Sequence, residues 1–389
     1  MECGIIALSL YGFLDCLSCK PYNQHCKKFQ NIDMRETTKA VLELEDGTIY
    51  EGKSFGCVKA CAGEVVFNTA MTGYPESLTD PSYEGQILVT TFPLLGNYGV
   101  PPKTVSDGIE DYLESGRIHC EAIVCQDYSW AYSHWLAERS LADWLESESI
   151  PGIYGVDTRA LTKRLREKGS MLGRILFEGG SSIPFVDPNK ENLLAKVSCK
   201  EPLTYGKGEK MVVLIDCGVK NNIIRSLVKR GVKVVRVPWN YDFNGMDYDG
   251  LFIANGPGDP DMAGEAVANI RKAIAGDKPI CGICMGNQLL AKAAGARTYK
   301  LKYGHRSHNQ PVMKTGSNKC FITSQNHGFA VDGNTLPDDW EPLFVNMNDG
   351  TNEGIRHKTK PFFSAQFHPE ACGGPLDTDF IFDDFVDML

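Results

Sequence analysis

The second half of the chain alternates between short apolar runs and amphipathic stretches, and this alternation restricts the possible folds more than any other feature of the sequence. The predicted order is strand, helix, strand, strand, helix, strand, helix, over residues 211–216, 222–229, 232–237, 251–254, 265–275, 279–282 and 288–294. Buried strands that alternate with helices are typical of a parallel sheet. We therefore expect an α/β domain with a mainly parallel, open sheet, helices on both faces, and a site at the carboxyl ends of its strands.

The length of the chain, 389 residues, predicts more than one domain, because single domains cluster near about 100–150 residues. A polar segment containing proline and glycine, 201–210, has the composition of a linker. Residues 34–200 are accordingly expected to form a mixed α/β domain, and residues 211–389 the open-sheet domain.

Strand signals dominate the start of the first domain. Residues 40–50 alternate on either side of an Asp46-Gly47 pair, which predicts a β-hairpin. Further strands are predicted at 64–68 and 86–91.

Two helices are predicted later in the same domain. Apolar residues recur at helical spacing over 134–147, and we expect Trp135 and Trp144 within that stretch to belong to the core. The second helix is predicted at 158–167, with Asp157 as its N-cap.

Composition and charge exclude several functional classes. Hydrophobic residues at 42% and charged residues at 23% are typical of a globular protein. A formal net charge of -9 provides no positive field for nucleic acid. No apolar run reaches the roughly 20 residues that a membrane span requires. Fourteen cysteines in a long chain without a cleavable signal peptide indicate a reducing compartment, so we expect a cytoplasmic protein.

Residues 1–33 differ in composition from the rest and are expected to be a disordered N-terminal extension. Cys16, Cys19, His25 and Cys26 leave a metal cluster open as the alternative. We favour the extension, and predict no metal, because a metal cluster needs four well-spaced ligands on a folded loop.

Cys284 is the strongest candidate for a catalytic residue. It follows the predicted strand 279–282 and precedes a helix that begins near Met285, with glycine on both sides at Gly282 and Gly286. Small neighbours at such a strand-to-helix turn permit the sharp backbone of a nucleophile elbow. A helix N-terminus also favours a thiolate. A buried structural cysteine is the alternative.

A base for Cys284 is predicted near the C-terminus. The run 362–370 ends in His368-Pro369-Glu370, and the stiff proline can hold the two ionisable side chains close together. Glu370 would then fix the tautomer of His368 and favour its imidazolium form.

The loop 255–260, Asn-Gly-Pro-Gly-Asp-Pro, follows the predicted strand 251–254. Its glycines let backbone N–H groups approach a ligand closely, so the loop could stabilise an oxyanion together with the amide of Met285. Taken alone, the loop would be only a turn.

Together, the segments 282–288 (G-I-C-x-G-x-Q), 255–260 and 367–370 (F-H-P-E) resemble the triad, or class I, glutamine amidotransferases. Other segments resemble the small subunit of carbamoyl phosphate synthetases. They are 44–47, 63–69, 71–76, 78–83, 96–99, 155–159 and 303–311.

The resemblance implies a role for each candidate. Cys284 would be the nucleophile, His368 the base and Glu370 its orienting group. His327 would be a residue near the pocket or a tuning group, ranked lower because no carboxylate was expected beside it. The residues implied to bind glutamine are Ser82, Gly256, Gly258, Met285, Gln288, Asn326, Gly328 and Phe329.

The resemblance further implies that the chain hydrolyses L-glutamine and passes ammonia to a large subunit in a heterodimer. That subunit would use ATP and Mg to make carbamoyl phosphate from bicarbonate, for arginine and pyrimidine biosynthesis. No cofactor is expected in this chain, which contains no G-x-x-x-x-G-K-[ST] loop. The alternatives are a stand-alone glutamine or γ-glutamyl hydrolase and a catalytically silent regulatory subunit. Many relatives carry histidine where this chain has Asn287, and we expect little loss of activity from that difference.

Overall fold

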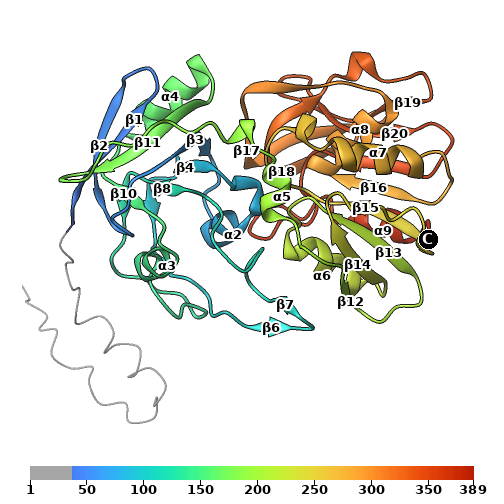
Figure 1. The fold of residues 1–389 in the computed structure, drawn as a ribbon, viewed down its shortest axis with the longest axis horizontal. Helices are drawn as coiled ribbons and strands as arrows, with labels where there is room; N and C mark the ends of the chain where they lie inside the picture. The colour runs from blue at the N-terminus through green and yellow to red at the C-terminus, as the bar shows by residue number, and fades with distance from the viewer. Residues whose placement is uncertain (1–36) are drawn as a thin grey trace, which may run out of the picture. The chain divides into compact units, whose positions relative to one another are not determined.

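The structure, a computed structural model, describes residues 37–389 (Figure 1). The predicted extension, 1–33, and the alternative metal ligands within it lie outside the described residues. No helix in the described range is long and apolar enough to cross a membrane.

The first domain is built on a closed β-barrel with the strand order β1-β11-β3-β4-β8-β10-β2. Its strands are β1 (Lys39–Leu44), β2 (Ile49–Ser54), β3 (Cys61–Asn68), β4 (Gln86–Thr90), β8 (Ala122–Val124), β10 (Gly152–Tyr154) and β11 (Met171–Phe177). Strand β1 pairs antiparallel with β2, which confirms the hairpin predicted around Asp46-Gly47. Strands β3 and β4 confirm the predictions at 64–68 and 86–91. Closure of the barrel was not predicted.

Short strands and helices surround the barrel. The strands are β5 (Leu94–Leu95), β6 (Val105–Ser106), β7 (Ile109–Glu110) and β9 (Asp127–Tyr128). The helices are α2 (Tyr74–Thr79), η2 (Pro81–Tyr83), α3 (Leu141–Ser147), α4 (Thr158–Lys168), η3 (Pro188–Lys190) and α5 (Leu193–Val197). Helix α4 confirms the second helix prediction, and its N-cap Asp157 accepts a hydrogen bond from the backbone N–H of Ala160 at 2.8 Å.

The helix predicted at 134–147 is only half correct. Helix α3 begins at Leu141, because Ser140 acts as the N-cap and accepts a hydrogen bond from the backbone N–H of Asp143. Trp144 is buried on this helix, as predicted, whereas Trp135 lies before it and is 80% exposed. The prediction that both tryptophans belong to the core is therefore wrong for Trp135.

The second domain contains a ten-stranded sheet in the order β12-β14-β13-β15-β16-β21-β20-β18-β17-β19. Its strands are β12 (Leu203–Tyr205), β13 (Met211–Asp216), β14 (Lys233–Pro238), β15 (Gly250–Ile253), β16 (Ile280–Ile283), β17 (Thr298–Lys314), β18 (Cys320–Val331), β19 (Trp340–Asn346), β20 (Asn352–His357) and β21 (Phe362–Ala365). Parallel pairing holds from β14 to β21. The other pairs are antiparallel, so the expectation of a mainly parallel sheet is corrected to a mixed one.

The antiparallel part arises from a stretch of chain without intervening helices. Strands β17 and β18 follow one another through a short turn and pair antiparallel, as directly connected strands do. At the opposite edge, β12 lies within the segment 201–210 that was expected to be a linker, and it pairs with β14.

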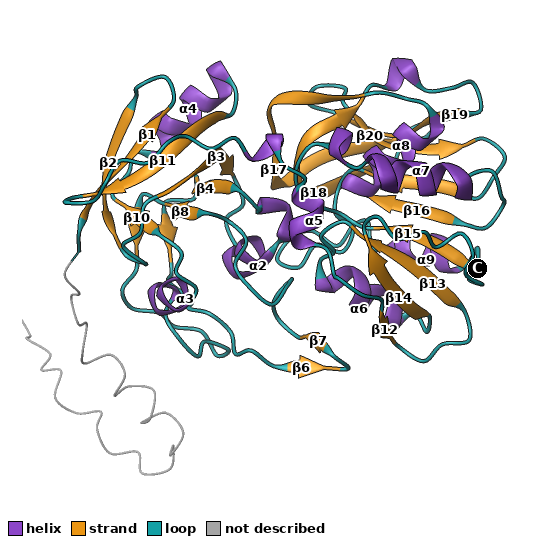
Figure 2. Cartoon of the chain, viewed as in Figure 1, coloured by secondary structure: helices purple, strands orange, loops and turns teal. Residues whose placement is uncertain are grey.

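Helices cover both faces of the parallel strands, as predicted (Figure 2). They are α6 (Asn221–Lys229), η4 (Pro260–Met262), α7 (Gly264–Ala273), α8 (Met285–Ala294), η5 (Gly333–Thr335) and α9 (Phe380–Val386). Val213 of β13 faces a core shared with α7 and α8, whereas its neighbour Val212 faces a core shared with α6 and α9. The parallel strands are therefore buried on both faces.

Candidate active site

The residues of the candidate site lie at the carboxyl ends of neighbouring parallel strands. Lys220 follows β13, Asn255 follows β15, Cys284 follows β16 and His368 follows β21. These strands are adjacent in the sheet. The topology therefore gathers residues that are distant in sequence at one edge, as expected for an open α/β sheet.

Cys284 occupies a strained backbone position between β16 and α8. Its φ and ψ angles are 55° and -103°, and its side chain is 2% exposed. A non-glycine residue in such a conformation costs on the order of 1–3 kcal/mol and persists only where its surroundings enforce it. The backbone N–H of Cys284 donates to the carbonyl of Ala365 at 2.8 Å, which ties the turn to β21. This is the geometry predicted for a nucleophile elbow.

The two flanking glycines are required by close backbone contacts. A Cβ atom at Gly282 would lie 2.6 Å from the carbonyl of Gly286, and one at Gly286 would lie 2.1 Å from the carbonyl oxygen of Ile253. Neither contact can be relieved by moving a flexible side chain. The glycine spacing around the cysteine is thus a steric requirement of this turn.

Gly286→Ala is expected to lower the free energy of unfolding by about 1–3 kcal/mol, the usual cost of overpacking. Urea denaturation of the purified chain measures this change. Gly264→Ala is the matched control, because a Cβ at Gly264, in the first turn of α7, meets nothing within 4 Å. We expect the control to be neutral or slightly stabilising, and equal destabilisation by both variants would contradict the steric argument.

His368 and Glu370 form the predicted pair. Nδ1 of His368 lies 2.7 Å from Oε1 of Glu370, and both side chains are buried. Burial opposes the imidazolium, but Glu370, with a smaller contribution from Cys284, raises the pKa of His368 to about 10. Nε2 of His368 is buried and makes no hydrogen bond with the described residues. Catalytic hydrogen bonds of this kind are often long before substrate binds.

Lys220 is a member of this cluster that the sequence did not reveal. Its Nζ lies 3.0 Å from Oε1 of Glu370, and the side chain is buried. Burial alone would raise the pKa of Glu370, but Lys220 and His368 lower it to about 2. The side chain of Asn222 also donates to the backbone carbonyl of Glu370. A lone lysine after a strand carries no sequence signal, so only the fold identifies it.

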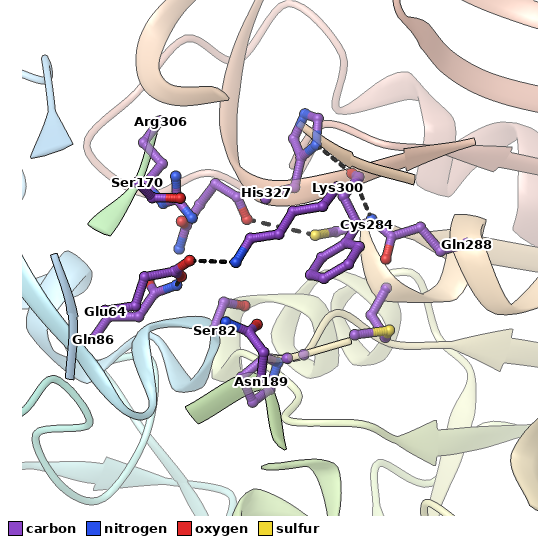
Figure 3. Close-up of a pocket in the computed structure, with 17 residues that line it drawn as sticks. Glu64, Ser82, Gln86, Ser170, Asn189, Cys284, Gln288, Lys300, Arg306 and His327 are labelled. Atoms are coloured by element: carbon purple, nitrogen blue, oxygen red, sulfur yellow. Dashed lines mark hydrogen bonds and ion pairs between the residues drawn. The ribbon is translucent and has the colours of Figure 1, made fainter. Parts of the chain in front are cut away.

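A pocket with about 450 Å³ of empty space adjoins Cys284 (Figure 3). The structure places all eight residues implied to bind glutamine in its lining: Ser82, Gly256, Gly258, Met285, Gln288, Asn326, Gly328 and Phe329. His368 lines a neighbouring cavity, which shares Asn326 with the pocket.

Ser82 enters the pocket from the first domain. Asp80 accepts a hydrogen bond from the backbone N–H of Ser82 at 2.9 Å and another from the side chain of Asn326 at 2.9 Å. Asn255 donates to Oγ of Ser82 at 3.0 Å. These contacts join both domains at the pocket, as the resemblance implied.

Gln288 is held by a buried amide network. Its Nε2 donates to the carbonyl of Phe329 at 2.9 Å and to Oε1 of Gln366 at 3.2 Å. Asn287 donates to the same Gln366 oxygen at 2.9 Å and accepts from Ser364 at 2.8 Å. Both amide hydrogens of Gln288 are therefore engaged. Asn287 supports this network and does not line the pocket.

The pocket lining also contains charged residues that were not predicted from the sequence. Nζ of Lys300 lies 2.6 Å from Oε1 of Glu64, an ion pair between the two domains that Figure 3 shows across the pocket from Cys284. Gln86 donates to the second carboxylate oxygen at 3.0 Å. Arg306, buried, also lines the pocket. Glu64 and Lys300 are distant in sequence, so no local pattern connects them.

His327 does have a carboxylate neighbour, contrary to the prediction. Nε2 of His327 lies 3.9 Å from Oε1 of Glu353, a buried carboxylate on β20. Burial nevertheless holds the pKa of His327 well below its ordinary value. The lower ranking of His327 remains, because it does not contact Glu370 and its Nδ1 bonds to the carbonyl of Phe329.

Comparisons with known proteins match two regions of the chain. The family "Carbamoyl-phosphate synthase small chain, CPSase domain" matches residues 42–175, and the family "Glutamine amidotransferase class-I" matches residues 213–388. "Carbamoyl-phosphate synthase [ammonia], mitochondrial" of Homo sapiens is 54% identical and covers 90% of this chain, which spans 24% of that protein. "Multifunctional protein URA2" of Saccharomyces cerevisiae is 51% identical and covers 90% of this chain, which spans 17% of that protein.

"Multifunctional protein pyr1-3" of Dictyostelium discoideum is 50% identical and covers 92% of the chain, which corresponds to 17% of that protein. The chain thus spans about a quarter or less of the length of these curated relatives. Its two matched regions, 42–175 and 213–388, make it a member of the family in which a carbamoyl-phosphate synthase small-chain domain precedes a class-I glutamine amidotransferase domain.

Proposed function

We propose that this chain hydrolyses L-glutamine to glutamate and ammonia and supplies the ammonia for carbamoyl phosphate synthesis. The observation that carries the proposal is the buried contact of His368 with Glu370 beside Cys284, whose backbone is strained into an elbow. An arrangement of nucleophile, base and orienting carboxylate is the general requirement for covalent acyl transfer.

The chemistry follows from this geometry. The thiolate of Cys284 attacks the side-chain carbonyl carbon of glutamine, and a tetrahedral oxyanion forms. Gly256, Gly258 and Met285 line the pocket beside Cys284, and their backbone N–H groups would stabilise this oxyanion. His368 gives its proton to the departing nitrogen, which leaves as ammonia. Water then attacks the thioester, and glutamate and free Cys284 are regenerated.

The pocket fits an α-amino acid better than a simple amide. Ser82, Gln288 and the backbone at Gly328 provide separate donors and acceptors around the space next to Cys284. Since both amide hydrogens of Gln288 are engaged, its Oε1 is the atom left for an ammonium group. Sites that hydrogen-bond a substrate's polar groups reject analogues that lack them.

The destination of the ammonia belongs to the same proposal. The relatives are several times longer than this chain, so we propose a synthetase partner, a separate subunit or a domain, that uses ATP, Mg and bicarbonate for arginine and pyrimidine biosynthesis. The human relative is named for ammonia, so membership of the family alone does not decide between glutamine and ammonia as the nitrogen source. The intact Cys284 site favours glutamine.

A trapping experiment tests the proposal. Mixing the chain with radiolabelled L-glutamine and quenching in acid should yield protein carrying label, released by hydroxylamine as expected for a thioester. Cys284→Ala should lose the label. Cys281→Ala, which changes a buried cysteine on the same strand, should keep it.

The alternatives give other results. A catalytically silent subunit would acquire no label, and iodoacetamide would spare Cys284. A stand-alone glutamine or γ-glutamyl hydrolase would reach its full glutaminase turnover without a synthetase partner. We expect the partner to raise that turnover.

The cytoplasm is the proposed location. Every cysteine in the described part of the chain is a free thiol, which suits a reducing compartment. The name of the human relative places that protein in mitochondria, and fractionation of cells from the native source distinguishes the two.

A further inference from the structure

A second cluster of ionisable side chains adjoins the pocket, since one of its members, His327, belongs to the pocket lining. Three strands contribute to it: β17 carries His305, β18 carries His327 and β20 carries Glu353. All three side chains are buried, and one potential ligand atom from each lies within 4.8 Å of the others. The proposed glutaminase chemistry uses none of these atoms.

Hydrogen bonds at the outer edges of the two rings fix their orientation. Nε2 of His305 lies 2.9 Å from Oδ2 of Asp349, and Nδ1 of His327 lies 2.8 Å from the carbonyl oxygen of Phe329. Both partners are acceptors, so each ring donates its N–H outward. The inner nitrogens, Nδ1 of His305 and Nε2 of His327, then carry lone pairs. Metal-binding histidines almost always have this outer hydrogen bond to a carboxylate or a backbone carbonyl.

The inner atoms of the two rings and of the carboxylate converge, and Asn346 donates a hydrogen bond to Oε1 of Glu353 at 3.0 Å. Oε1 of Glu353 lies 3.4 Å from Nδ1 of His305 and 3.9 Å from Nε2 of His327. Oε1 of Gln325 lies 3.2 Å from the same His327 nitrogen. Within residues 37–389, Nδ1 of His305 and Oε2 of Glu353 are buried and make no hydrogen bond. A positive charge between these atoms, either a proton on His305 or a metal ion, would stabilise this arrangement.

We propose that His305, His327 and Glu353 bind one divalent transition-metal ion, with Zn²⁺ as the best fit. Zn²⁺ forms bonds of about 2.0–2.2 Å to imidazole nitrogen and carboxylate oxygen in tetrahedral sites, which places neighbouring ligand atoms about 3.3 Å apart. The two distances to Glu353, 3.4 and 3.9 Å, are close to this value, and the whole set, which lies within 4.8 Å, would contract around the ion. Oε1 of Gln325 is placed to be the fourth ligand.

The metal would have a structural role for the pocket. The carbonyl of Phe329 that accepts from His327 also accepts from Gln288, a residue of the pocket lining. A metal that joins β17, β18 and β20 would hold this carbonyl in place. Cys284 and His368 are not among its ligands, so the proposal stands independently of the glutaminase function.

A proton is the competitor for this position. Burial lowers the affinity of His305 for a proton, but Glu353 and Asp349 together raise the pKa of His305 above its ordinary value. The experiment must therefore separate a bound metal from an imidazolium paired with two carboxylates.

The test uses the full chain without a histidine tag. After removal of metals by chelation, the chain is mixed with one equivalent of Zn²⁺ or Co²⁺, gel-filtered and analysed by plasma mass spectrometry. We expect about one bound metal per chain and, with Co²⁺, the visible absorption of a four-coordinate ion. His305→Asn and Glu353→Gln should each lose the bound metal. Asp349→Asn should weaken binding by about 10- to 100-fold, as loss of an outer hydrogen bond does.

Two controls isolate the cluster. His357→Asn removes another histidine that pairs with a carboxylate, Asp339 at 3.2 Å, and it should retain the metal. A thiolate charge-transfer band with Co²⁺ would assign the metal to cysteines instead and overturn the proposal. Wild-type protein that retains no metal, or His305→Asn protein with the same circular dichroism and the same metal content as wild type, would also overturn it.

Discussion

Replacing Cys284 with serine is expected to abolish glutamine-dependent carbamoyl phosphate synthesis while synthesis from added ammonia continues. The serine hydroxyl is a far weaker nucleophile than the thiolate at neutral pH, and the elbow holds it in the same strained position. We expect glutamine-dependent synthesis to fall by at least about 10⁴-fold, as for other enzymes that lose their nucleophile. Ammonia supplied in solution needs no Cys284, because it enters the reaction after the thioester step.

Both syntheses are measured on the chain assembled with its synthetase partner, at saturating ATP and bicarbonate. Cys281→Ala is the matched control, because this buried thiol on β16 belongs to a hydrophobic core and is not part of the pocket lining. It should retain both activities. If Cys284→Ser removes both activities equally, the cysteine supports assembly or folding and is not the nucleophile.

Local sequence signals identified Cys284 and His368 as the candidate nucleophile and base. Gly282 and Gly286 are required by contacts only a few residues away or with the adjacent strand, so their spacing is visible in sequence. His368 and Glu370 are two residues apart, and their pairing follows from the stiff proline between them. The parallel strands could also be predicted from local sequence, because each is a continuous apolar run.

Partners brought together by pairing of distant strands were not predictable. Lys220 and Glu370 are 150 positions apart, and Glu64 and Lys300 are 236 positions apart. Barrel closure and the antiparallel half of the second sheet depend on such pairings too. The predicted start of the helix at 134–147 was wrong for a different reason. The N-cap at Ser140 begins the helix, although the apolar spacing extends before that residue.

Glu370→Gln is the second change with a large expected effect. The amide can still accept a hydrogen bond from His368, but it carries no charge to stabilise the imidazolium. The pKa of His368 should therefore fall from about 10 toward its ordinary value, and proton transfer to the leaving ammonia should weaken. We expect kcat for glutamine hydrolysis to fall by about 10²- to 10⁴-fold, the usual contribution of acid–base catalysis.

The variant also removes the nearest carboxylate of buried Lys220 and leaves Glu114 and Asp80 to stabilise its charge. We therefore expect part of the about 3–5 kcal/mol that an uncompensated buried charge costs. The double variant Glu370→Gln/Lys220→Met removes this charge. It should recover part of the lost stability but not the lost kcat, which separates the two effects. Glu341→Gln is the control, because it removes a solvent-accessible partner of Arg356. It should change neither the free energy of unfolding nor kcat appreciably.

The effect of Glu370 and His368 can also be measured from the pH dependence of the free energy of unfolding, and the direction of each change is defined. The pKa of Glu370 is lowered to about 2 in the folded chain, so its contribution to stability is complete above about pH 4.5 and is lost as the pH falls toward 2. The pKa of His368 is raised to about 10, so its contribution is complete below about pH 6.5 and is lost as the pH rises toward 10. Glu370→Gln should flatten both slopes in urea titrations across this range. A variant that keeps both slopes and its kcat would show that Glu370 does not control the charge of His368.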